Sequence, residues 1–81
     1  MGLRDTINMM LSSDYKDRFK AEYYQTKYRA DRLHNMLDEL EAGTLSFKPT
    51  CPVVVLQEQE RQMRNYLDIL VIRAKIEGIE L

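Results

Sequence analysis

The chain has 81 residues and a formal net charge of −1, with one cysteine and one histidine. A chain this short forms one domain, residues 1–81, and buries only about 60–65% of its unfolded surface, so we expect self-association to stabilise it. One cysteine excludes an internal disulfide, one histidine excludes the cysteine/histidine zinc spacings, and the near-zero charge lacks the basic excess that nucleic-acid binding requires.

The distribution of apolar residues gives no sign of a signal peptide or a membrane span. The longest apolar runs, residues 53–56 and 69–72, are far too short to cross a bilayer. An unpaired cysteine fits a reducing compartment. We therefore predict a cytoplasmic protein with no cofactor, no metal, no nucleic-acid partner and no membrane partner.

The first predicted element is a short amphipathic helix within residues 1–12. Leu3, Ile7, Met10 and Leu11 recur at i, i+4, i+7 and i+8, which places them on one helical face. Residues 12–14, Ser-Ser-Asp, interrupt this pattern and offer N-caps for the next helix.

A long helix is predicted over residues 14–42, which contain neither glycine nor proline. At 1.5 Å per residue it is about 43 Å long, so it needs a partner to pack against. Gly43 ends it in the position that favours a left-handed residue. Its apolar and small residues recur in alternating steps of four and three, the pattern of a coiled-coil seam: Phe19, Tyr23, Thr26, Ala30, Leu33, Leu37 and Leu40.

A second long helix is predicted over residues 52–77, after a loop at residues 43–51 in which Pro49 breaks helix. Gly78 followed by Ile79 indicates its C-terminal end. The predicted fold is all-α, with a short N-terminal helix and a long antiparallel, coiled-coil-like αα-hairpin, in an oligomer. The second seam again follows steps of four and three: Leu56, Glu60, Met63, Leu67, Leu70 and Ala74.

The two seams predict how the hairpin is aligned. With Phe19 opposite Ala74, Ala30 faces Met63, so large residues meet small ones in both layers, as dense packing requires. The weak layer sets Leu33 against Glu60, and Gln59 is the alternative inner residue.

The second long helix is apolar on two sides. Ile69, Ile72 and Ile76, together with Val54 and Ile79, project opposite the seam. A helix of this kind needs two neighbours, of which the second is either the N-terminal helix or another chain. We favour a homo-oligomer, with this predicted interface: Ile7, Met10, Leu11, Ile69, Ile72 and Ile76.

The stretch EYYQTKYR, residues 22–29, carries three tyrosines. Tyr23 lies on the seam and is predicted to be core, whereas Tyr24 and Tyr28 lie on the far side of the helix. Two such rings beside cations suit a planar anionic ligand, because a base stacks on tyrosine and a phosphate pairs with lysine or arginine. A subunit interface or idle exposure are the alternatives. The predicted ligand-binding residues, including two on one flank of the second helix, are Lys20, Tyr24, Lys27, Tyr28, Arg32, Tyr66 and Arg73.

Other chemically active residues give weaker patterns. Asp31, His34 and Asp38 share one helical face, which we interpret as solvated rather than as a metal site. Cys51 is interpreted as a cap or packing residue. The sequence contains no glycine-rich phosphate loop, no Ser-His-Asp set and no pair of buried carboxylates, so we predict no catalytic residues and no enzymatic activity.

The second long helix resembles that of small phage-encoded helical-hairpin proteins grouped as crAss-phage related. The stretch DYKDRFKAEYYQTKY is similar to their first helix, so the resemblance covers roughly residues 14–81. It implies a phage or prophage origin and no established active residues. The matching positions of the second helix are Leu56, Gln59, Met63, Tyr66, Leu67, Ile69, Leu70, Arg73, Ile76 and Glu77.

These observations lead to a binding function. Our leading hypothesis is a non-enzymatic phage accessory protein of the host cytoplasm that counters antiviral defence by sequestering a nucleotide-type immune signal in an oligomer of helical hairpins. Some phage hairpin oligomers of similar outline act as sponges for such signals, an analogy of architecture alone. The alternatives are an inhibitor or adaptor that binds a host protein, and a purely structural coiled-coil assembly protein.

Overall fold

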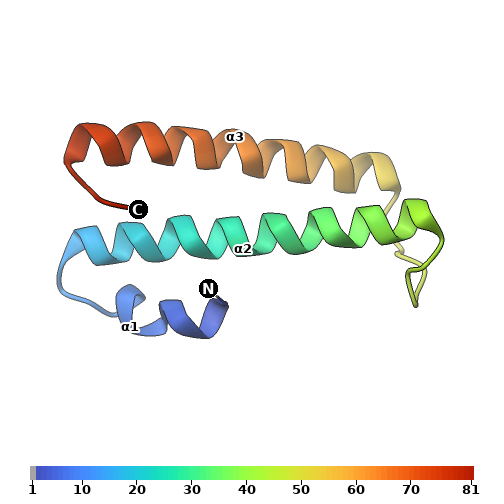
Figure 1. The fold of residues 1–81 in the computed structure, drawn as a ribbon, viewed down its shortest axis with the longest axis horizontal. Helices are drawn as coiled ribbons and strands as arrows, with labels where there is room; N and C mark the ends of the chain where they lie inside the picture. Colours follow the sequence, from blue (N-terminus) through green and yellow to red (C-terminus); the bar gives the residue numbers. More distant parts are fainter. Residues whose placement is uncertain (1) are drawn as a thin grey trace.

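The computed structural model describes residues 2–81 and consists of helices in three layers (Figure 1). A 3₁₀ turn, η1 (Leu3–Thr6), continues into a single α-helical turn, α1 (Ile7–Met10). The long helices α2 (Tyr15–Ala42) and α3 (Val53–Glu77) form an antiparallel hairpin. The all-α hairpin fold is thus confirmed. The predicted N-terminal helix is partly 3₁₀, and its Met1 lies outside the described residues.

Local signals set the ends of the long helices. The Asp14 side chain accepts a hydrogen bond from the Lys16 backbone N–H at 3.0 Å, which caps the start of α2. Gly43 and Gly78 end α2 and α3 at φ values of 76° and 69°, a left-handed conformation that glycine adopts without strain. Ile79 N–H then bonds the Ala74 carbonyl oxygen at 2.8 Å. The chain therefore reverses immediately after α3.

This reversal corrects one prediction. Ile79 was expected on the outer side of the second helix with Val54, but it is only 6% exposed. Because the chain turns back at Gly78, Ile79 joins a core cluster with Phe19, Leu70 and Ala74. Helical periodicity does not apply beyond the cap, so it could not place this residue.

The core lies where the start of α2 meets the end of α3. Phe19, Leu70 and Ala74 are 6%, 1% and 2% exposed and belong to one cluster, which agrees with the predicted alignment of Phe19 with Ala74. Tyr23 packs against this cluster but is only half-buried, so it is a boundary residue rather than full core.

The N-terminal segment forms the third layer and packs on α2, on the side away from α3 (Figure 1). Thr6 and Ala21 are fully buried in this contact region, and Gln25 Nε2 donates a hydrogen bond to Thr6 Oγ1 at 2.9 Å. The N-terminal helix is therefore not the second neighbour of α3, one of the two options that the sequence left open.

The predicted oligomer residues consequently form two separate surfaces. Ile7, Met10 and Leu11 lie on the N-terminal layer, whereas the three isoleucines lie on α3, across α2 from it (Figure 1). All six side chains are exposed in the single chain. Within residues 2–81, no helix combines the length and the hydrophobicity needed to cross a bilayer.

Replacing Phe19 with alanine should lower the free energy of unfolding by about 3–5 kcal/mol, because the missing ring leaves a cavity between α2 and α3. Urea unfolding followed by circular dichroism measures this loss. Phe47→Ala is the matched control, since Phe47 is 56% exposed, and should cost under about 0.5 kcal/mol. Equal losses in the two variants would contradict the position of the core.

Candidate ligand-binding site

A hollow of about 490 Å³ lies over the two outer tyrosines. Tyr24, Lys27, Tyr28 and Asp31 line it from α2, because residues three, four and seven positions apart share one helical face. Gly2 lines it from the N-terminal segment, which runs along this side of α2. The hollow therefore forms between α2 and the N-terminal segment, and the pattern of residues on α2 alone does not predict it.

Neighbouring side chains hold the tyrosine rings in place. Arg32 Nη1 donates a hydrogen bond to the Tyr28 hydroxyl at 3.1 Å, and its guanidinium carbon lies 5.7 Å from the centre of the same ring. Tyr24 meets Tyr23 edge-on, with ring centres 5.2 Å apart. A fixed ring loses little conformational freedom when a ligand stacks on it.

The hollow contains both signs of charge. Lys27 Nζ lies 3.7 Å from Asp31 Oδ2. A lysine at this position pairs with a phosphate, and a carboxylate accepts hydrogen bonds from the hydroxyl and amino groups of a ligand. The set can bind a polar anion, and it includes no nucleophile paired with a base.

The structure does not bring all predicted ligand residues together within one chain. Lys20 lies one turn before Tyr24 on α2 and is half-buried. Arg73 stacks on the Phe19 ring at 4.9 Å. The hydrogen bond to Glu77 is the main cause of a raised pKa of Arg73, and the charge of the nearby Glu22 contributes to it. Glu22 and Tyr24 point about 200° apart on α2, since each residue turns the helix by about 100°. Arg73 therefore lies on the opposite flank of the hairpin.

Tyr66 lies on that opposite flank as well, because it precedes Arg73 by two helical turns. Its side chain is 42% exposed. The predicted ligand-binding residues thus divide into a distant pair on α3 and a group at the hollow. Tyr24, Lys27 and Tyr28 line the hollow, whereas Arg32 bonds to Tyr28 and lines the neighbouring hollow with Met36 and Phe47.

The face of Asp31, His34 and Asp38 is solvated as predicted, with side chains that are 49%, 52% and 63% exposed, and it also makes contacts with charged groups of α3. Arg64 Nη1 binds Asp31 at 2.8 Å, and its Nη2 binds Glu60 at 3.3 Å. His34 lies 3.0 Å from Glu60 through Nδ1 and 3.2 Å from Asp38 through Nε2. This network of charged contacts connects α2 with α3 because the seam contains a glutamate at position 60 instead of an apolar residue. The hydrogen bond from Arg64 lowers the pKa of Asp31.

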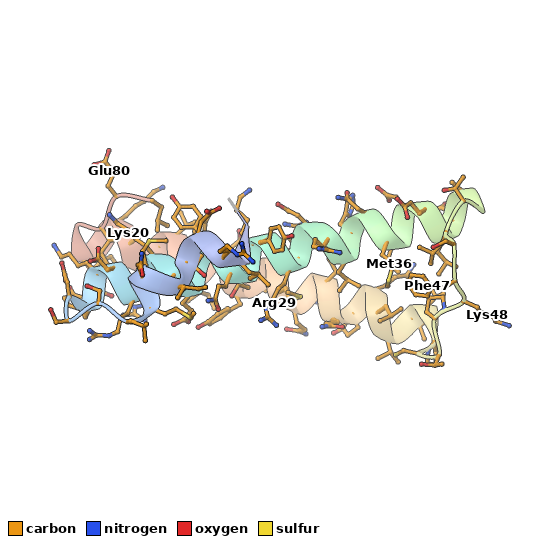
Figure 2. The ribbon with its side chains drawn as sticks, turned by 90° about the horizontal axis from the view of Figure 1, so that it is seen from below. Lys20, Arg29, Met36, Phe47, Lys48 and Glu80 are labelled. Carbon is orange, nitrogen blue, oxygen red and sulfur yellow. The ribbon has the colours of Figure 1, made fainter. Side chains whose placement is uncertain are left out.

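Other hollows lack the tyrosine pair. One of about 560 Å³ is lined by His34 and Glu60, towards the loop, and by no tyrosine or phenylalanine. Another is lined by Met36 and Phe47, which lie close together near the loop, while Lys48 points away from the hairpin (Figure 2). In the part of the chain that the structure describes, no group of three His, Cys, Asp or Glu residues is placed to hold a metal ion.

Two residues of the hollow were absent from the predicted set. Gly2 carried no signal, because its position depends on how the N-terminal segment packs. Asp31 did carry one, since it lies seven residues after Tyr24 on the same helical face, but it was interpreted only together with His34 and Asp38.

The Sequestin family model matches residues 13–76, which contain the whole of α2 and nearly all of α3. The chain belongs to the Sequestin family. The family name indicates sequestering proteins and fits a binding role rather than a catalytic one. Comparisons with curated proteins and with solved structures gave no significant match.

The family match covers only part of the hollow. Its four lining residues on α2 lie inside the matched range, whereas Gly2 lies outside it. The match does not bear on the crAss-phage resemblance, so the phage origin of the chain stays a prediction.

Replacing Gln25 with alanine should loosen the N-terminal wall of the hollow. The variant removes the hydrogen bonds from Nε2 to Thr6 Oγ1 at 2.9 Å and to the Met10 sulfur at 2.7 Å, and we expect a loss of about 0.5–1.5 kcal/mol. Amide hydrogen exchange of residues 11 and 12, which bond back into α1, should become faster while α3 is unchanged. The exposed Gln59→Ala is the control, and equal exchange in both variants would contradict this docking.

The pair of Asp31 and Arg64 should stabilise the hairpin only when Asp31 is ionised. The folded-state pKa of Asp31 lies below its ordinary value of 3.8, so the contribution is present above pH 3.8 and is lost as the pH falls through the lowered pKa. Above pH 3.8, Asp31→Asn should be about 0.2–1 kcal/mol less stable than the unchanged chain, the range of exposed ion pairs. Thermal unfolding at a series of pH values measures this difference. A gap that persists in strong acid would show that the ion pair is not its cause.

Proposed function

We propose that this Sequestin-family chain is a non-enzymatic phage accessory protein that sequesters a nucleotide-type immune signal in the host cytoplasm and so blunts antiviral defence. The observation that carries the proposal is the hollow in which Tyr24 and Tyr28 lie beside Lys27. The family supports sequestration in general, and the chemistry of the hollow supports a nucleotide as the ligand.

The side chains at the hollow, together with Arg32 beside it, have proposed roles. A base stacks on Tyr24 or Tyr28, since every base offers a π-face to an aromatic ring. Lys27 pairs with a phosphate, and Arg32, already bonded to the Tyr28 hydroxyl, adds positive charge beside that ring. Asp31 accepts hydrogen bonds from ribose hydroxyls or base amino groups.

Two of the predicted ligand residues lie outside the proposed site. Tyr66 and Arg73 are on the other flank of the hairpin, so they do not reach a ligand at the hollow of the same chain. Lys20 lies one turn before Tyr24 and adds a second positive charge on the same side of α2 as Lys27.

Isothermal titration against cyclic oligonucleotides and ADP-ribose derivatives tests the ligand class. Tyr24→Ala and Tyr28→Ala should each weaken binding by about 1–3 kcal/mol, the usual contribution of one stacked base, which is roughly 5- to 150-fold in the dissociation constant. Lys27→Ala should weaken the binding of anionic ligands and leave the binding of neutral nucleosides unchanged.

Tyr15→Ala is the matched control, because Tyr15 lies on α2 outside the hollow and is 47% exposed. It should bind as the unchanged chain does. No binding to any member of the panel, or equal losses for Tyr15 and Tyr24, would reject the nucleotide site.

A second candidate function, inhibition of a host protein, is favoured by the exposed isoleucines of α3, since helix faces of this kind dock on proteins. A pull-down from host lysate separates the two functions. A stoichiometric host protein retained by the unchanged chain and lost with Ile76→Asp would favour the inhibitor, whereas a sequestering protein should retain none.

A further inference from the structure

A stripe of three isoleucines remains uncovered on the outer face of α3. Ile69, Ile72 and Ile76 are 55%, 58% and 79% exposed. The N-terminal segment packs on the far side of α2, and the residues after Gly78 turn back towards α2, so within residues 2–81 neither segment covers this face (Figure 1). The stripe is open to another molecule.

The stripe has sharp limits along α3. Towards the start of the helix the same face carries Glu58 and Arg61, which bond to each other through Arg61 Nε at 2.7 Å. The continuous apolar surface is therefore confined to about the last two turns, because these charges separate it from the exposed Val54 at the start of the helix. It follows the steps of three and four that face a partner helix in a coiled coil.

The charged residues beside the stripe form a complementary pattern. Asp68 precedes Ile69 and Lys75 precedes Ile76, so both lie on the same edge of the stripe, one heptad apart. Neither forms an ion pair within residues 2–81. On the opposite edge, Arg73 is already bonded to Glu77 at 2.7 Å and stacked on Phe19.

We infer that a second copy of the chain covers the stripe, with the two α3 helices antiparallel about a two-fold axis near Ile72. In this arrangement Ile72 meets Ile72 of the second copy, and Ile69 meets Ile76. The two-fold also sets equal edges side by side, so Asp68 of each copy faces Lys75 of the other, and the ion pair forms twice.

The charges select this direction over a parallel one. Two parallel helices would set opposite edges together, and Asp68 would face Arg73, which Glu77 and the Phe19 ring already hold. Lys75 would then stay unpaired. The antiparallel pairing uses both free charges and consumes the stripe of each copy once, so the assembly closes as a dimer.

This inference does not depend on the ligand, so its test uses the chain alone. Sedimentation at micromolar concentration should give twice the 9.6 kDa mass of one chain, and Ile72→Asp should give a single chain with unchanged helicity. Leu11→Asp is the control, because Leu11 is 79% exposed on the N-terminal layer, and should leave the dimer intact. A monomeric unchanged chain, or dissociation by Leu11→Asp alone, would overturn the proposal.

A charge exchange tests the direction. Asp68→Lys and Lys75→Asp each place like charges together twice and should raise the dimer dissociation constant about tenfold, as expected for a total change near 1.4 kcal/mol over two exposed pairs. The double variant restores both pairs and should recover the original dissociation constant. Failure of the double variant to recover, with each single variant weakened, would overturn the antiparallel pairing.

Disulfide trapping gives a readout that does not depend on affinity. In a Cys51→Ser background, Ile69→Cys and Ile76→Cys proteins are mixed and oxidised. The antiparallel dimer should crosslink position 69 of one copy to position 76 of the other and give little crosslinking in either protein alone. Crosslinking of each protein to itself, without the mixed product, would show a parallel pair and overturn the proposal.

Discussion

The packing of Leu70, Ala74 and Ile79 around the Phe19 ring is the interaction on which the rest of the structure depends. The buried side chains of α2 all lie between Phe19 and Ala30, and those of α3 all lie between Leu67 and Ala74. Phe19 joins these regions because alanine at position 74 leaves room for its ring. The N-terminal layer adds cover at the same end, where Ala21 is fully buried. The hairpin is therefore packed most tightly at the end away from its loop.

Towards the loop, the two long helices are joined by charged contacts more than by apolar packing. Asp31, Arg64, Glu60 and His34 form contacts across the two long helices where the seam contains no fully buried side chain. Half-exposed ion pairs contribute little to the free energy of folding. Each pair nevertheless joins one particular residue of α2 to one of α3, so the pairs fix which turns of the two helices lie side by side. The same network reaches the candidate site, because Asp31 bonds Arg64 on one side and lines the hollow with Lys27 on the other.

The candidate site is a product of layering. α2 contacts α3 along one side and the N-terminal segment along another, and the tyrosines lie on the side that the short segment only partly covers. A hollow bounded by rings, a lysine and a carboxylate has the groups needed to hold a nucleotide and none of the paired groups that activate a nucleophile. Membership of the Sequestin family agrees with a binding role in general, and the matched residues contain the whole α2 wall of the hollow.

The sequence by itself determined the two long helices, their ends and the alignment of Phe19 with Ala74, because these follow from apolar spacing, capping residues and glycines that act within a few positions. It also placed Tyr24 and Tyr28 together on the outer side of α2. Only the tertiary structure decided which neighbour each face receives. The N-terminal segment packs on α2, where Gln25 bonds to Thr6. The turn at Gly78 buries Ile79. Tyr66 and Arg73 lie on the flank of the hairpin opposite to the hollow. Each of these outcomes depends on how elements distant in the chain meet in space, and periodicity along one helix contains no information about that.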